Sequence, residues 1–555
     1  MSMFCFQCQE AAGGEGCTVV GSCGKTARTA ALQDALMHVA RGVAIYADPI
    51  QHQPSAFDSI QSAVHAWLRL ALFTTITNAN FEDEAIEARI RSGLDLRFDL
   101  QKRCKDEQLN VPLAASHAAT WNPCGSLEIL PDIQAEIGVK PTWNSDESSL
   151  SELLTYGLKG LSAYLHHAAE LGWTDSSLNA FLVRALVATI NPHDDVSTLT
   201  ALVMEAGENG VKAMALLDSA NTGRYGHPEQ TQVSIGVGLR PGILVSGHDL
   251  ADLEALLVQS EDAGIDIYTH CEMLPAHSYP GFKKYRHLYG NYGNAWWQQH
   301  KEFTSFRGPI LFTTNCIVPP PKHASYADKV FTTGATGFPG YRYIDRGPDG
   351  EKDFSELIAM AQCSEPPVPL ESGTITCGFA HNQVAELATP ILEAIESGAV
   401  KRFVVMAGCD GRHAQRDYYR NFAEKLSNDT VILTAGCAKY RYNKLDLGFI
   451  ETPGGNTIPR ILDAGQCNDS YSLALTALTL KDALGLDDIN SLPIEYNIAW
   501  YEQKAVIVLL ALLYLGVKDI QLGPTLPAFL SSGVTSLLVE QFGIHGIPTP
   551  EKVVA

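Results

Sequence analysis

The sequence predicts a multidomain α and α/β protein, in which a helical-bundle N-terminal domain precedes two α/β domains with mainly parallel sheets. With 555 residues, the chain is too long for one compact core. Apolar residues recur at helical spacing through the first part of the chain, and from about Gln230 short β-branched runs alternate with helical stretches. We expect domains at residues 1–225, 226–376 and 377–555, with the second boundary near Gly373–His381.

The helical region is predicted from its apolar stripes. The first stripe contains Leu32, Leu36, Val39 and Val43, and Pro49 should end that helix because proline disrupts helical hydrogen bonding. A proline-rich stretch between residues 110 and 141 indicates a long connection. The remaining stripes predict helices at Ser59–Asn78, Glu82–Lys105, Ser149–Glu170 and Ser177–Ile190.

The second half contains short apolar runs of the kind found in buried parallel strands. Between them lie helical stretches, including a predicted helix at Gln383–Ser397. This alternation is typical of βαβ units. The predicted strands are Gly242–Ser246, Ile265–Tyr268, Pro309–Thr313, Phe403–Met406, Val431–Thr434 and Ile461–Asp463.

Composition and charge narrow the class of protein. The net charge of −22 disfavours nucleic acid as the main partner. No secretory leader opens the sequence, and the longest apolar run, Ala505–Val517, is too short to cross a bilayer. We therefore expect a cytoplasmic monomer that binds neither nucleic acid nor a membrane. In that compartment, most of the thirteen cysteines should be free of disulfides.

Four cysteines near the N-terminus form a C-x2-C-x8-C-x5-C array: Cys5, Cys8, Cys17 and Cys23. The glycine-rich loop that carries them can wrap four thiolates around one metal centre. Four thiolates suit either tetrahedral zinc or an iron–sulfur cluster. The spacing predicts a metal site and leaves the choice between these two open.

A second set of ligand-type residues follows the predicted strands. In open α/β sheets, residues at the carboxyl ends of neighbouring strands converge on one crevice. The set mixes thiolates with imidazole and carboxylate, which suits a centre that binds a substrate as well as passing electrons. Its members are His248, Glu272, Cys316, Cys409, Cys437 and Cys467.

The other cysteines have no ligand-type residues near them in the sequence, with one exception. Cys104, Cys124, Cys363 and Cys377 lie in helical or connecting sequence and are expected to be structural. Cys271 is ambiguous because it adjoins Glu272, although strand alternation would send the two side chains to opposite faces.

Several long motifs resemble the hybrid-cluster protein family, also called hydroxylamine reductases, and the resemblance runs from Met3 to the C-terminal region. Its motifs are residues 4–10 (FCFQCQE), 246–250 (SGHDL), 272–275 (EMLP), 313–316 (TTNC), 405–412 (VMAGCDGR), 433–443, 463–471 (DAGQCNDSY) and 500–504 (WYEQK).

This resemblance implies two clusters. A [4Fe–4S] cluster would be held by the four N-terminal cysteines, whose short spacing resembles the anaerobe-type members of the family. A hybrid [4Fe–2O–2S] cluster would be held by the strand-end set together with Glu502, and Cys409 matches the position that carries a persulfide in the family. Glu502 lies in a predicted helix and is added by the resemblance alone. Cys271 is the main departure, because the family resembled has a smaller residue there.

The implied activity is the two-electron reduction of hydroxylamine to ammonia and water, with the N-terminal cluster relaying electrons from an external donor protein. Glu502, Lys504 and Cys409 are the expected catalytic residues. Lys504, His270 and Tyr501 are candidate proton donors, since burial can bring the pKa of a lysine towards neutrality. Alternatively, Lys504 is a salt-bridge partner of Glu502.

Three other functions stay open. Nitric oxide reduction in nitrosative-stress defence would fit the same cluster. A non-catalytic sensor or nitrosyl-transfer protein is a different class of answer. Carbon monoxide chemistry is less favoured, although the family resembled is related to carbon monoxide dehydrogenases.

Overall fold

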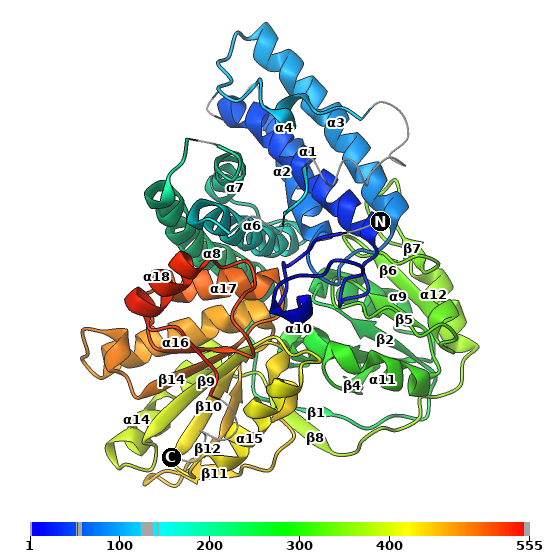
Figure 1. The fold of residues 1–555 in the computed structure, drawn as a ribbon. Helices are drawn as coiled ribbons and strands as arrows, with labels where there is room; N and C mark the ends of the chain where they lie inside the picture. Colours follow the sequence, from blue (N-terminus) through cyan, green and yellow to red (C-terminus); the bar gives the residue numbers. More distant parts are fainter. Residues whose placement is uncertain are drawn as a thin grey trace.

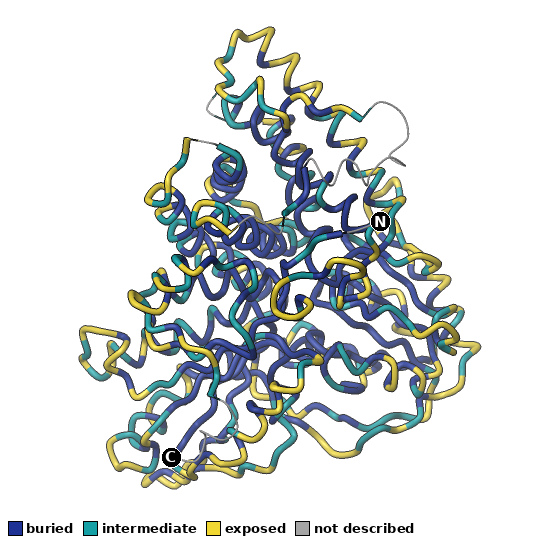
Figure 2. The backbone as a smooth tube through the Cα atoms, in the orientation of Figure 1, coloured by how far each residue is buried: buried dark blue, intermediate teal, exposed yellow. Residues whose placement is uncertain are grey.

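The structure, a computed structural model, describes residues 3–51, 53, 58–123, 137–140, 144–191 and 193–548. A helical region comes first, and two six-stranded sheets follow it, which confirms the predicted fold class. Figure 1 shows the helical region above the two α/β regions, which lie side by side beneath it. The buried backbone is concentrated where these three regions meet (Figure 2).

The helical region contains all four helices predicted from apolar stripes after the first. The first helix, α1, runs through Pro49 to Gln51, so the prediction that Pro49 ends it is wrong by two residues. Proline removes one intrahelical hydrogen bond, and the chain can finish its last turn before leaving the helix. The helices are α1 (Ala27–Gln51), α2 (Asp58–Thr74), α3 (Asp83–Asp106), α4 (His117–Thr120), α6 (Asp146–Glu170), α7 (Ser176–Ala188) and α8 (Val196–Tyr225).

The first sheet has the strand order β4-β3-β2-β5-β6-β7, and every neighbouring pair is parallel. Its strands are β2 (Gly242–Ser246), β3 (Asp266–His270), β4 (Leu288–Asn291), β5 (Ile310–Phe312), β6 (Val330–Thr333) and β7 (Arg342–Ile344). The helices of this region are α9 (Leu250–Ser260), α10 (Pro280–Lys283), α11 (Gln299–Phe306) and α12 (Ser355–Gln362).

The second sheet has the order β13-β10-β9-β14-β15-β16 and is also parallel throughout. Its strands are β9 (Arg402–Gly408), β10 (Thr430–Thr434), β13 (Ile461–Asp463), β14 (Ile494–Ala499), β15 (Ile520–Gly523) and β16 (His545–Gly546). Its helices are α13 (His381–Glu386), α14 (Ala388–Glu396), α15 (Asp417–Lys425), α16 (Ser470–Ala483), α17 (Gln503–Tyr514) and α18 (Ser532–Phe542). The single helix expected at Gln383–Ser397 is thus two helices that meet at Leu387.

Two antiparallel ribbons complete the strands of the described chain. One pairs β1 (Thr231–Ser234) with β8 (Thr374–Cys377), the segments that precede and follow the first sheet. The other pairs β11 (Phe449–Glu451) with β12 (Thr457–Pro459). The helical region ends at Tyr225 with α8, and the three-domain division stays a prediction.

Helix α17 ties the second sheet to the helical region, because it packs against α6 and α8. Glycines permit this close approach. A β-carbon at Gly160 of α6 would lie 2.4 Å from the carbonyl oxygen of Gln503, and one at Gly207 of α8 would lie 2.3 Å from that of Leu510. The start of α17 is therefore fixed by backbone contact with α6.

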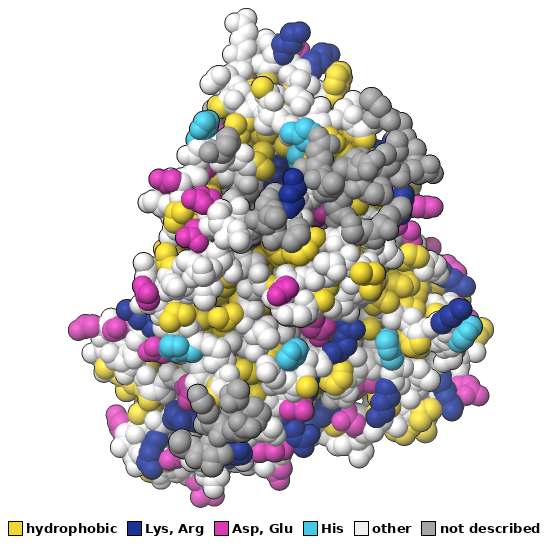
Figure 3. Space-filling model, in the orientation of Figure 1, with side chains coloured by type: hydrophobic (Ala, Val, Ile, Leu, Met, Phe, Trp, Pro, Cys, Tyr) yellow, Lys and Arg dark blue, Asp and Glu magenta, His cyan; other side chains and the backbone are white. Residues whose placement is uncertain are grey.

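No helix among the described residues is long and apolar enough to cross a membrane. On the face shown in Figure 3, acidic and basic side chains are interspersed among the described residues, and no continuous basic stripe is seen there.

Candidate metal centres

Three predicted ligands follow three adjacent strands of the first sheet. His248 lies two residues beyond β2, Glu272 two beyond β3, and Cys316 four beyond β5. Because β3, β2 and β5 are neighbours and parallel, their carboxyl ends deliver these residues to the same edge.

Four ligands follow four adjacent strands of the second sheet. Cys467, Cys437 and Cys409 come after β13, β10 and β9, and Glu502 comes three residues after β14. The expectation that Glu502 lies within a helix is wrong. It is the N-cap of α17, and its carboxylate accepts a hydrogen bond from the backbone N–H of Lys504 at 2.8 Å. Glu502 thus follows the same strand-end rule as the other ligands.

Glycines bring the strand ends of the second sheet close together. Gly408 and Gly436 have φ of +110° and +83° and directly precede Cys409 and Cys437. A β-carbon at Gly436 would lie 2.4 Å from the carbonyl oxygen of Gly408. Only glycine fits both the positive φ and this contact, so each Gly-Cys pair turns the chain and presents its sulfur.

Contacts link the two sets of ligands. The backbone N–H of Cys467 donates to Glu272 Oε2 at 2.8 Å, and His248 Nε2 lies 3.6 Å from the same oxygen. His248, Glu272 and Cys467 are the only described residues that bring three ligand atoms within 4.8 Å of one another. Glu272 Oε1 is buried without a hydrogen-bond partner, which is expensive unless a cation or metal satisfies it.

Cys409, Cys437 and Cys467 are buried and Cys316 is half-buried, and the described cysteines are free of disulfides. Burial raises the pKa of Cys316 and Cys409 well above the usual value of a thiol. Neighbouring acidic groups raise it further for both, whereas Lys504 lowers it for Cys316. A bound metal would stabilise the thiolates that this environment disfavours. The donor set therefore fits a metal centre of mixed sulfur, nitrogen and oxygen ligation.

Lys504 lies among the ligands. Its Nζ donates to Asn315 Oδ1 at 2.8 Å, lies 2.9 Å from His248 Nε2 and is 3.7 Å from Glu502 Oε1. Burial lowers its pKa, but Cys467 as a thiolate and Glu502 as a carboxylate outweigh burial and raise it. The expected shift towards neutrality is thus wrong in direction, and the salt-bridge interpretation fits the geometry.

The two other candidate proton donors are already hydrogen-bonded. His270, the last residue of β3, places Nε2 3.1 Å from Glu302 Oε2 and Nδ1 2.9 Å from Ser246 Oγ. The hydroxyl of Tyr501 donates to Asn78 Oδ1 at 2.9 Å. Their part in proton delivery stays a prediction.

The N-terminal cysteines are held by a short loop. Cys5 and Cys17 form an antiparallel bridge, in which N–H···O distances are 3.1 and 2.8 Å. Lys25 Nζ donates to Cys5 Sγ at 3.4 Å. Burial raises the pKa of Cys8 and Cys23, and the charge of Cys5 raises both further.

The spread of these sulfurs bears on the choice between zinc and an iron–sulfur cluster. Four thiolates around one zinc ion at about 2.3 Å would lie about 3.8 Å from one another. Yet no three of the four N-terminal sulfurs, all in the described chain, lie within 4.8 Å of one another. The described loop therefore does not hold three sulfurs at the spacing that one zinc ion requires.

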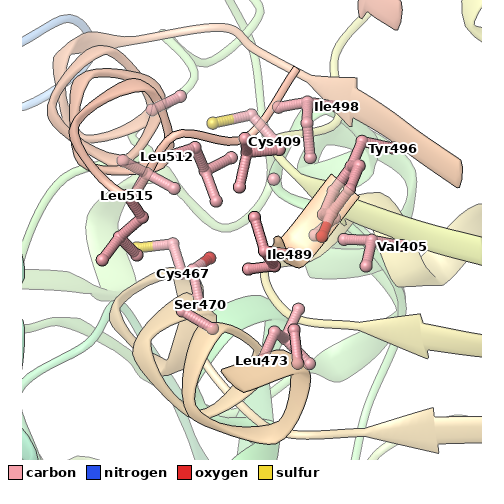
Figure 4. Close-up of a pocket in the computed structure, with 17 residues that line it drawn as sticks. Val405, Cys409, Cys467, Ser470, Leu473, Ile489, Tyr496, Ile498, Leu512 and Leu515 are labelled. Carbon is pink, nitrogen blue, oxygen red and sulfur yellow. The ribbon is translucent and has the colours of Figure 1, made fainter. Parts of the chain in front are cut away.

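An apolar cavity of about 30 Å³ adjoins Cys409 and Cys467 (Figure 4). Figure 4 shows both cysteines together with apolar side chains such as Ile489 and Leu512. A second apolar cavity of about 220 Å³, between α14, α16 and the sheet, shares Ala477 with the first. A void of this kind accommodates small molecules with little charge.

The remaining cysteines differ in environment. Cys104 is buried and donates to the carbonyl oxygen of Tyr46, and Cys377 is also buried. Cys363 is exposed, and Cys124 lies outside the described residues. Cys271 is buried at the start of a 3-10 helix rather than in a strand, with a left-handed φ of 56°. The strand-alternation argument therefore does not apply to it.

The chain matches the Prismane/CO dehydrogenase family over residues 3–554. It belongs to this family. It is 56% identical over 550 residues to a hydroxylamine reductase of Porphyromonas gingivalis, covering 99% of this chain and 98% of the relative. It is 54% identical over 580 residues to a hydroxylamine reductase of Clostridium botulinum, covering 100% of this chain and 99% of the relative.

Solved structures show the same fold at low identity. Carbon monoxide dehydrogenase IV from Carboxydothermus hydrogenoformans superposes with a TM-score of 0.55 at 17% identity, covering 99% of this chain and 91% of that one. A nickel-free carbon monoxide dehydrogenase from Thermococcus sp. AM4 gives 0.55 at 18%, covering 99% and 89%. Membership of the Prismane family implies iron–sulfur clusters, and the two groups of buried and half-buried cysteines fit them.

Proposed function

We propose that this protein reduces hydroxylamine to ammonia and water at a hybrid [4Fe–2O–2S] cluster held between the two sheets. The observation that carries the proposal is the convergence of four cysteines, one histidine and two glutamates from three adjacent strand ends of one sheet and four of the other. Relatives more than half identical over the full length bear the name hydroxylamine reductase. The proposed ligands are His248, Glu272, Cys316, Cys409, Cys437, Cys467 and Glu502.

A [4Fe–4S] cluster on Cys5, Cys8, Cys17 and Cys23 would relay electrons to this centre. No three of the four sulfurs, all of them in the described chain, lie within 4.8 Å of one another, which supports a cluster over a single zinc ion. An external one-electron donor protein would approach at the loop between Cys17 and Cys23, where Val19 and Val20 are 75% and 55% exposed.

The reaction consumes two electrons and two protons, breaks the N–O bond, and releases one ammonia and one water. When bound, the hybrid cluster supplies the electrons and a Lewis-acidic iron for the substrate. The chain supplies the surroundings. Lys504 places a buried positive charge beside His248 and Glu502, where it offsets negative charge that accumulates during reduction. Its raised pKa keeps its proton in place at neutral pH.

Cys409 is proposed to carry a persulfide, and it lies at the wall of the apolar cavity. Hydroxylamine is small enough for that cavity, whose lining excludes bulk water. The cytoplasmic location and the monomeric state stay predictions.

Nitric oxide reduction is a second candidate, because an apolar approach to Cys409 and Cys467 favours an uncharged diatomic gas. One anaerobic preparation, reduced with methyl viologen, tests both functions. We expect hydroxylamine turnover with stoichiometric ammonia, lost in Glu502→Gln. Faster turnover of nitric oxide than of hydroxylamine would favour the second function. Turnover of neither substrate by protein with full iron would refute both and favour a sensor.

A further inference from the structure

Arg416 is a buried arginine without an acidic partner. It precedes α15, and its exposed fraction is 0%. None of the ion pairs formed by the described residues includes it, although its neighbours Arg412 and Arg441 pair with Glu10 and Asp410. A buried cation is costly unless a negative charge compensates it. Compensation must therefore come from hydrogen bonds and from negative charges beyond ion-pair distance.

The guanidinium joins three chain segments that each carry a ligand of the two proposed centres. Its Nη1 donates to the carbonyl oxygen of Cys409 at 2.9 Å. Its Nη2 donates to Gln9 Oε1 at 2.8 Å and to the carbonyl oxygen of Trp500 at 2.7 Å. Gln9 directly follows Cys8 of the N-terminal array, and Trp500 precedes Glu502 by two residues.

Beside the guanidinium, one hydrogen bond connects the Cys8–Gln9 segment directly to the Trp500–Tyr501 segment. The backbone N–H of Gln9 donates to the carbonyl oxygen of Tyr501 at 3.0 Å. The covalent chain thus runs from Cys8 to Gln9, crosses a single hydrogen bond, and continues from Tyr501 to Glu502.

Gly411 makes room for the arginine. A β-carbon there would lie 3.0 Å from Arg416 Nε and 3.1 Å from Glu10 Oε1. The segment that follows Cys409 is therefore shaped to admit this guanidinium between the two ligand groups.

We propose that Arg416 is a positioning residue for electron transfer between the two centres: it holds the Cys8–Gln9 segment against Trp500–Tyr501, and its charge stabilises the reduced form of both centres. The inference rests on the two-cluster function proposed above. With both clusters bound, one electron at a time would pass from the N-terminal cluster to the second centre. The external donor then replaces the electron, and Arg416 itself makes and breaks no covalent bond.

The test compares wild-type protein with Arg416→Gln and Arg416→Lys, purified anaerobically. Arg460→Gln is the matched control, because Arg460 is 4% exposed and also bonds backbone carbonyls. Those carbonyls lie before and at the start of β10, at the opposite end of the sheet from the ligands. Both glutamine variants should lose thermal stability.

Redox titration followed by EPR separates charge from packing. In Arg416→Gln, the midpoint potentials of both centres should move to more negative values, whereas Arg460→Gln should match wild type. Arg416→Lys keeps the positive charge and loses the paired Nη donors of the guanidinium, so the midpoint potentials of both centres should stay near those of wild type. Freeze-quench EPR after one-electron photoreduction should show electrons reaching the second centre several-fold more slowly in Arg416→Lys.

Unchanged potentials in Arg416→Gln, or an equal shift in Arg460→Gln, would overturn the inference. If Arg416→Gln does not fold, the lysine variant decides: a wild-type transfer rate overturns the positioning role. Iron content and the spectrum of wild-type protein are measured first. A wild-type protein that binds iron at one centre or at neither refutes the proposed function and this inference together. If wild-type protein has both centres, the variants test the role of Arg416 alone.

Discussion

The contact between α6 and the start of α17 predicts that one methyl group disturbs the second centre from outside it. In Gly160→Ala, the new β-carbon would lie 2.4 Å from the carbonyl oxygen of Gln503, about 1 Å short of the 3.4 Å at which ordinary contacts begin. Backbone must move, and overpacking of this kind costs about 1–3 kcal/mol. Alanine recovers about 0.5–1 kcal/mol as the better helix former, so we expect a net loss of about 1–2 kcal/mol.

Because Gln503 adjoins Glu502, the displacement of the Gln503 backbone should also weaken iron binding at the second centre. The assay is the thermal unfolding midpoint together with iron per chain. Gly223→Ala in α8 is the control: its β-carbon would meet Trp173 at 3.5 Å, an ordinary contact, so stability should hold or rise slightly. A Gly160→Ala protein that unfolds no earlier than wild type and keeps full iron would refute the reasoning.

Three further predictions concern single side chains. Thr314→Val removes the hydroxyl that contacts the backbone N–H of His248 at 2.9 Å and the Nδ1 atom of His248 at 3.0 Å. The iron affinity of the second centre should therefore fall about 10–100-fold while the N-terminal cluster is kept. Equal loss of iron at both centres would contradict this. Burial, then Arg41 and His117, lowers the pKa of His38 to about 3, so the folded state binds fewer protons than the unfolded state between pH 3 and 6.5 and stability falls as the pH falls. This histidine alone should cost about 2 kcal/mol between pH 7 and 5, and His38→Gln should lose correspondingly less over that range in thermal unfolding; an identical loss would rule the contribution out. Iodoacetamide at pH 8 should label exposed Cys363 and spare Cys104, because burial raises the pKa of Cys104 to about 11. Mass spectrometry of the peptides measures the labelling, and a labelled Cys104 beside an unlabelled Cys363 would contradict the prediction.

Much of the fold could be predicted because buried parallel strands have a simple signature. The runs ending before His248, Cys409 and Cys437 are continuous and apolar, and the ligands follow them at once. The apolar pattern does not predict strand β14, because Glu495, Tyr496 and Asn497 interrupt it. The pattern therefore does not identify Glu502 as a strand-end ligand, although it follows its strand as the other ligands do.

Other features depend on tertiary contacts that composition does not reveal. Burial alone predicts that the pKa of Lys504 falls, but Cys467, distant in sequence, joins Glu502 beside it and raises the pKa. Arg416 carries no local signal at all, because its partners at Gln9 and Trp500 lie far away in sequence. The two pairs Gly157–Gly160 and Gly207–Gly210, spaced three apart on α6 and α8, could have indicated the close packing of a third helix.

The central claim is that this chain holds two separate iron centres, one on the N-terminal cysteines and one between the sheets. An anomalous difference map at the iron edge, from anaerobically grown crystals, tests it most directly. The account predicts two peaks, one within the Cys5–Cys23 loop and one among His248, Glu272 and Cys467. A single iron peak, or a zinc signal at the N-terminal loop, would contradict it.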